Sequence, residues 1–125
     1  MRKIISTNQA PAAIGPYSQA IEVSNMLFIS GQIPVNPETG QIDAEDITGQ
    51  TQQSFANLKA ILAEAGCTLS NVVKTTVFLT DMSHFEGMNA IYATQFTDDF
   101  PARSTIAVKA LPKGALVEIE AIAVK

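Results

Sequence analysis

Arg103 is the side chain best suited to hold a small organic acid. It opens a predicted strand directly after Phe100-Pro101-Ala102. A guanidinium fixed at such a place can clamp a carboxylate through two parallel hydrogen bonds. The alternatives are a solvated surface arginine or a structural ion pair, and the sequence alone leaves them open.

Two glutamates, Glu118 and Glu120, are suited to proton transfer. The two-residue period of a strand places both on one face of the last predicted strand, beside Ile122 and Val124. Burial or mutual repulsion there would raise the pKa of one carboxyl, which prepares it for proton transfer. The alternatives are an exposed sheet edge or an ion pair with Arg103 across the strands.

A glycine and a tyrosine mark two further places for a ligand. The segment Ser30-Gly31-Gln32 ends a strand predicted to be buried, and a glycine there lets a ligand approach the backbone. A bulge or a turn would also require that glycine. Tyr17 follows Gly15-Pro16 on a predicted loop, where it covers a small pocket or packs against the edge of the core.

The chain has one histidine, His84, and one cysteine, Cys67. We expect His84 at the surface, and Cys67 has no base beside it in the sequence that would make it a nucleophile. One His and one Cys are too few for an ordinary zinc site, and no glycine-rich phosphate loop or G-x-S-x-G turn is present. We therefore expect no metal and no organic cofactor. The remaining class of reaction is acid–base chemistry by a carboxylate and water, with an arginine to hold an acid.

Hydrophobic periodicity predicts the elements that must position these residues. Strands are predicted over residues 4–5, 19–23, 26–29, 71–81, 103–108 and 116–124. A helix over residues 48–65 places Phe55, Leu58, Leu62 and Ala65 on one face, and Gly66 ends it. A second helix follows a predicted capping box of Ser83 and Glu86. Its apolar face holds Phe85, Met88, Tyr92 and Phe96.

The element order β-β-β-α-β-α-β-β predicts one α+β domain over residues 1–125, with a mixed sheet and both helices on one face. The run Met26–Ile29 predicts a strand buried on both faces, and Val73, Thr75, Val77 and Leu79 are predicted to share one face. The other sheet face would be bare in a monomer. Because charged residues make up only 16% of the chain, we expect that face to meet another subunit.

Charge and composition limit the partners. The formal net charge is −4 and the eight basic residues are scattered, which disfavours nucleic acids and anionic membranes. No apolar run approaches the length of a membrane span or a signal peptide. A single cysteine gives no sign of an oxidising compartment, so we expect a cytoplasmic protein.

Several blocks of the chain, taken together, resemble a known family. They are residues 10–20 (Ala-Pro-Ala-Ala-Ile-Gly-Pro-Tyr-Ser-Gln-Ala), 28–34 (Phe-Ile-Ser-Gly-Gln-Ile-Pro), 57–59, 73–79, 100–104 (Phe-Pro-Ala-Arg-Ser), 111–113 and 117–120 (Val-Glu-Ile-Glu). In this order they resemble the RidA family of enamine/imine deaminases, also called the YjgF family. The resemblance covers nearly the whole chain.

The resemblance implies a homotrimer with a chorismate-mutase-like fold, in which the sheets form a central barrel and three sites lie between subunits. It implies hydrolysis of 2-iminobutanoate, 2-iminopropanoate and related imines, released by pyridoxal-phosphate dehydratases, to 2-oxo acids and ammonia. Arg103 then corresponds to the carboxylate clamp and Glu118 to the residue that activates water. Other pocket positions correspond to Tyr17, Ser30, Gly31 and Asn89.

One position departs from the family pattern. Many members have cysteine two residues after the arginine, where this chain has Thr105. The resemblance implies that the backbone carbonyl of this residue holds the imine nitrogen, so the exchange is compatible with activity. Alternative functions are a trimer that binds 2-oxo acids and regulates a partner protein, a ribonuclease or translation inhibitor, and a chaperone-like protein.

Overall fold

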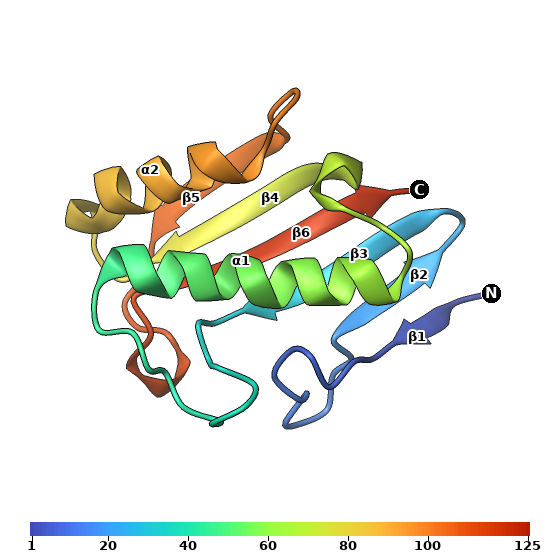
Figure 1. Ribbon diagram of the computed structural model, residues 1–125, viewed down its shortest axis with the longest axis horizontal. Coiled ribbons are helices and arrows are strands. Elements are labelled where there is room, and N and C mark those ends of the chain that lie inside the picture. The colour runs from blue at the N-terminus through green and yellow to red at the C-terminus, as the bar shows by residue number, and fades with distance from the viewer.

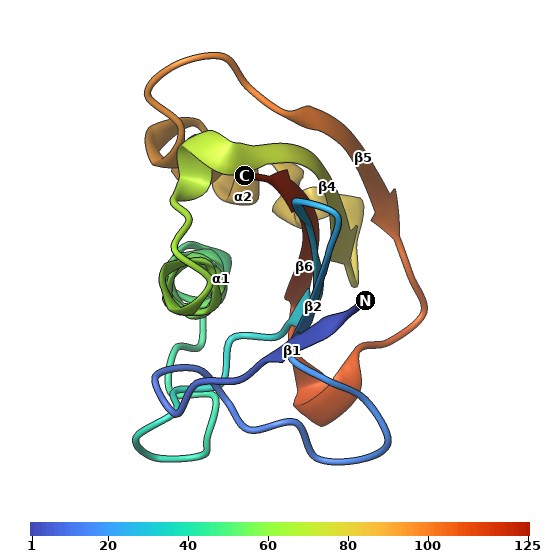
Figure 2. The ribbon, with the colours of Figure 1, turned by 90° about the vertical axis from the view of Figure 1, so that its right-hand side faces the viewer.

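The protein is described by a computed structural model of residues 1–125, in which two helices cover one face of a six-stranded sheet (Figures 1 and 2). The strands are β1 (Lys3–Ile5), β2 (Ala20–Val23), β3 (Met26–Gln32), β4 (Val72–Leu79), β5 (Ala102–Ala107) and β6 (Val117–Val124). The helices are α1 (Ile47–Glu64) and α2 (Phe85–Gln95), with short 3-10 turns at Leu69–Asn71, Met82–His84 and Pro112–Gly114. The predicted element order and the mixed α+β class are confirmed.

The strand order in the sheet is β1-β2-β3-β6-β4-β5. Every pair of neighbours is antiparallel except β4 and β5, which are parallel because α2 provides the crossover between them. The hairpin of β2 and β3 turns at Ser24 and Asn25, both with positive φ, as a two-residue hairpin loop requires. In this order, β5 lies at one edge of the sheet and β1 at the other.

The core lies between the helices and the covered face of the sheet. The predicted apolar face of α1 is buried, as are Met88 and Tyr92 of α2 and Phe96 directly after it. On β6 the alternation is regular: four side chains (Val117, Ile119, Ala121 and Ala123) are buried under the helices. Glu118, Glu120, Ile122 and Val124 point to the other face, which no element covers (Figure 2). Neither helix is long and apolar enough to cross a membrane.

Two predictions of burial are wrong. Val73 does not share the buried face of β4: it is 46% exposed while Val72 is buried. The pairing of β4 with β6 shifts register between Val72 and Lys74, and this irregularity reverses the alternation. On β3, Leu27 is buried but Phe28 is 40% exposed, because the chain itself covers only one face of the sheet.

The predicted capping box before α2 is also wrong. The carboxylate of Asp81, not the hydroxyl of Ser83, is the capping group, and it accepts a hydrogen bond from the Ser83 N–H at 2.8 Å. A 3-10 turn then leads into α2, whose own N-cap residue, His84, has no side-chain cap. Ser83 lies inside the 3-10 turn that Asp81 caps, so it is not at the N-cap position of α2.

Candidate active site

Arg103 lies on the edge strand β5 and reaches toward α2. Its Nη1 donates to Asn89 Oδ1 at 2.8 Å, and its Cζ lies 4.6 Å from the centre of the Tyr92 ring and 5.6 Å from that of Phe85. The chain has a single ion pair, between Lys125 and Glu22, so Arg103 has no carboxylate partner. The half-buried guanidinium is thus neither freely solvated nor ion-paired, and most of its N–H groups have no acceptor in the chain.

The backbone of β5 offers hydrogen-bonding groups beside Arg103. The N–H of Val108 donates to Leu79 O of β4 at 2.7 Å. Because the backbone direction alternates along a strand, the N–H and C=O of Arg103 and Thr105 point away from β4, to the open edge. The Thr105 side chain turns inward, where its Oγ1 is buried without a partner. Arg103, Asn89 and the Thr105 carbonyl form what we call the arginine half-site.

Glu118 and Gly31 lie against each other on the uncovered face. A Cβ added to Gly31 would overlap Glu118 Oε2 and would lie 2.8 Å from its Cδ, so the carboxylate occupies the space that a side chain at Gly31 would fill. Gly31 also sits where the β3–β6 pairing shifts register between Ile29 and Gln32. The alternative of a bulge is confirmed, and the space beside this glycine is taken by the Glu118 carboxylate. The approach of a ligand to this backbone stays a prediction.

Burial raises the pKa of the Glu118 carboxyl above its ordinary value, and the neighbouring charge of Glu120 raises it further. The prediction that this glutamate pair would raise one pKa is confirmed. An ion pair between Glu118 and Arg103 is excluded, because Arg103 shares the helix-covered face with its register partner Thr75. Glu118 is on the opposite face, level with Phe78.

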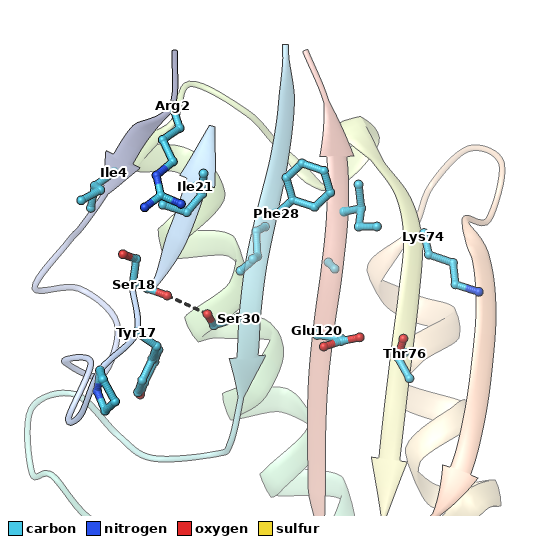
Figure 3. Close-up of a pocket in the computed structure, with 14 residues that line it drawn as sticks. Arg2, Ile4, Tyr17, Ser18, Ile21, Phe28, Ser30, Lys74, Thr76 and Glu120 are labelled. Atoms are coloured by element: carbon cyan, nitrogen blue, oxygen red, sulfur yellow. Dashed lines mark hydrogen bonds between the residues drawn. The ribbon is translucent and has the colours of Figure 1, made fainter. Parts of the chain in front are cut away.

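Tyr17 and Ser30 line a cavity of about 660 Å³ on the uncovered face (Figure 3). Ser30 Oγ donates to Ser18 O at 2.6 Å, which ties the loop that carries Tyr17 to β3. Tyr17 is 53% exposed. Glu120 lines the same cavity, and Glu118 lies two residues before it on the same face of β6. Tyr17, Ser30, Gly31 and Glu118 form what we call the glutamate half-site.

A single chain therefore holds the predicted site residues as two groups on opposite faces of the sheet. The arginine half-site lies between β5 and α2, and the glutamate half-site lies at the ends of β3 and β6. Sequence reasoning missed the contacts that Phe85 and Tyr92 make with Arg103. Asn89 and Tyr92 are three residues apart on one helix, and that spacing was the available signal.

The fold and these two half-sites define a small α+β protein with an arginine that has no carboxylate partner and a glutamate whose pKa is raised. A family model described as Endoribonuclease L-PSP matches residues 7–125. The chain belongs to this family, whose members are also named RidA and YjgF. The resemblance found in the sequence is confirmed.

Curated relatives match along the whole chain. A RutC family protein of Pyrococcus horikoshii is 53% identical over 125 residues, covering 100% of this chain and 99% of its own. The protein named 2-iminobutanoate/2-iminopropanoate deaminase is 51% identical in mouse and in Escherichia coli K12, covering 100% of this chain and 93% and 99% of theirs.

Solved structures agree with the fold. A Rid family protein of Yersinia pestis superposes with a TM-score of 0.98 at 52% identity, covering 100% of both chains. The E. coli protein TdcF, solved with bound serine, superposes with a TM-score of 0.94 at 46% identity, covering 98% of each chain.

Proposed function

We propose that this protein is a cofactor-independent deaminase that hydrolyses 2-iminobutanoate, 2-iminopropanoate and similar 2-imino acids to 2-oxo acids and ammonia. The observation that carries the proposal is the state of Arg103: half-buried, supported by aromatic rings and without any carboxylate of its own. Such a guanidinium is prepared for the carboxylate of a ligand. Relatives at 51% identity carry the name of this deaminase.

In the proposed reaction, Arg103 binds the substrate carboxylate and the Thr105 carbonyl accepts a hydrogen bond from the iminium N–H. Glu118 orients a water molecule against C2 and takes its proton as the C2–O bond forms. Glu118 then passes this proton to the nitrogen of the carbinolamine. As the C2–N bond breaks and ammonia leaves, Glu118 takes the C2 hydroxyl proton, and the C2–O bond becomes the carbonyl of the 2-oxo acid. Orientation supplies much of the rate gain, and general base assistance adds roughly 10²- to 10⁴-fold.

We further propose that the protein is a homotrimer of chorismate-mutase-like architecture, in which each site combines the arginine half-site of one copy with the glutamate half-site of its neighbour. Two observations support this arrangement. The half-sites lie on opposite faces within one chain. The uncovered face also exposes large apolar side chains, which a second copy would bury: Ile4, Met26, Phe28, Ile106 and Val124.

The proposed substrates arise beside cytoplasmic pyridoxal-phosphate dehydratases, so we place the protein in the same compartment. The family description also names an endoribonuclease. RNA recognition relies on basic and aromatic surface, and the net charge of −4 gives it little support.

A coupled assay tests the deaminase. Threonine dehydratase generates 2-iminobutanoate in the presence of semicarbazide, which traps the imine, and semicarbazone formation is followed with and without the protein. We expect the protein to suppress the semicarbazone and Arg103→Ala to lose this effect. Lys59→Ala, which removes an exposed charge from α1, serves as the matched control.

Each result of this assay has a consequence. Suppression by Arg103→Ala equal to that of the native protein would overturn the clamp. If neither protein suppresses the semicarbazone while 2-oxobutanoate still binds the native form, the protein is a metabolite-binding module and not an enzyme. Cleavage of a labelled RNA by the same preparations would favour the ribonuclease.

A further inference from the structure

Arg103 is supported by two residues of α2 that take no step in the proposed reaction, Asn89 of the arginine half-site and Tyr92. The Tyr92 ring faces the guanidinium with 4.6 Å between the ring centre and Cζ, and Asn89 Oδ1 accepts from Nη1 at 2.8 Å. Both residues project from the same face of α2. An arginine without such supports samples many rotamers, and a ligand must then stop that motion when it binds.

Tyr92 is itself fixed on three sides. Its hydroxyl forms a 2.7 Å hydrogen bond with Thr75 Oγ1, and Thr75 is the register partner of Arg103 on the neighbouring strand. Its ring packs edge-on against Phe55, with ring centres 5.6 Å apart, and tilted against Phe96 at 5.1 Å. Only 3% of Tyr92 is exposed. Contacts within the core therefore fix the orientation of the Tyr92 ring, which the Arg103 guanidinium faces.

We propose that Tyr92 is a positioning residue that orients Arg103 for the substrate carboxylate, with Thr75 fixing the Tyr92 ring and Asn89 fixing one edge of the guanidinium. With Nη1 committed to Asn89, the remaining N–H groups present one defined edge to a ligand at the open side of β5. Asn89 then acts on the substrate through Arg103. This inference rests on the proposed clamp role of Arg103.

The test measures binding of two ligands that differ only in charge. Calorimetry gives the Kd of 2-oxobutanoate and of its neutral amide for the native protein and for Tyr92→Leu. Loss of the ring should raise the Kd of the acid roughly two- to thirtyfold, the range of a cation–π contact, and leave the Kd of the amide nearly unchanged. Tyr92→Phe keeps the ring but loses the hydroxyl that bonds to Thr75, so it should recover most, but not all, of the native affinity for the acid.

Phe96→Leu is the matched control. Phe96 belongs to the same aromatic cluster and touches the Tyr92 ring, but it does not contact Arg103. We expect it to lower the thermal unfolding temperature and to change the Kd of the acid much less than Tyr92→Leu does, since the Tyr92 ring and its bond to Thr75 remain. If Tyr92→Leu does not fold, Tyr92→Met replaces it, because the flexible methionine adapts to the irregular space left by the ring.

Three results would overturn the inference: equal weakening of acid and amide by the Tyr92 variant, equal weakening of the acid by Phe96→Leu, or an unchanged Kd for the acid in a folded Tyr92→Leu or Tyr92→Met. The Phe variant is a further check, since no gain in affinity over Tyr92→Leu would show that the ring does not orient Arg103. Arg103→Ala separates a failure of the proposed function from a failure of the positioning role of Tyr92. If it binds the acid normally, the proposed function fails; if it loses the acid while the Tyr92 variants do not, only the positioning role fails.

Discussion

Glu118 shows how the setting of one residue fixes its chemistry. Partial burial and the charge of Glu120 both oppose ionisation of its carboxyl, so its pKa in the folded protein lies above that in the unfolded chain. A base with a raised pKa accepts a proton from water more readily. The same shift has an effect on stability, since the charged form is disfavoured only when the chain is folded.

Glu118→Gln should therefore stabilise the protein at neutral pH. The contribution of Glu118 to stability is present below the ordinary glutamate pKa and is lost as pH rises through the raised value. Thermal unfolding followed from pH 4 to 8 should show a higher unfolding temperature for Glu118→Gln at pH 7 and a shrinking difference toward pH 4. Glu38→Gln, at an exposed turn, is the control. A Glu118→Gln protein that is less stable at pH 7 would contradict the prediction.

Gly31→Ala tests the space that the Glu118 carboxylate occupies. The added methyl group would overlap Glu118 Oε2, and the flexible carboxylate end is the part that can move. We expect kcat to fall by roughly 100-fold, as a misplaced reacting group allows, with a small change in unfolding temperature. In a Glu118→Gln background the same substitution should have little further effect. Equal losses in both backgrounds would assign Gly31 a role independent of Glu118.

At the scale of elements, the long helix α1 supports the sheet and contributes no side chain to either half-site. It begins at Ile47, one residue before the predicted start, with Asp46 as N-cap, and it ends where Gly66 adopts a positive φ as predicted. The Asp46 carboxylate accepts from the Gly49 N–H at 2.8 Å. Loss of this capping hydrogen bond should therefore lower the stability of the protein and leave its activity unchanged.

Asp46→Ala should destabilise the protein by about 1 kcal/mol, the usual loss of an N-cap. Urea unfolding measures the change, and Asp46→Asn, which keeps an acceptor, should retain most of the stability. The kcat/KM of the folded Asp46→Ala protein should equal that of the native protein. A tenfold loss of kcat/KM would show that α1 is coupled to the site.

At the scale of the whole molecule, the two half-sites require more than one chain if they act together. Arg103 and Glu118 lie on opposite faces of one sheet, so neither can reach a substrate held by the other within a monomer. In the proposed trimer each copy supplies its two half-sites to two different sites. Variants that damage different half-sites should then complement each other.

Arg103→Ala and Glu118→Gln, each strongly impaired alone, should recover activity when the two chains are unfolded together and reassembled in equal amounts. Random assembly makes about one quarter of the sites complete, one half multiplied by one half. The deaminase assay on the reassembled mixture should thus give about one quarter of the native activity. Activity no greater than that of the separate variants would show that each site uses one chain or a different pair of residues.

The sequence by itself determined the order of the elements and most of their inward faces. It also placed Glu118 and Glu120 on one face of a strand. These features follow from the 3.6-residue period of a helix and the two-residue period of a strand, which depend only on residues close together in the sequence. It did not predict the bulge that turns Val73 outward, since a register shift depends on the partner strand. Nor did it predict the cap at Asp81 or the Tyr92 support of Arg103. Only the tertiary structure decided that Arg103 and Glu118 face opposite ways, because that depends on how α2 and three neighbouring strands pack together.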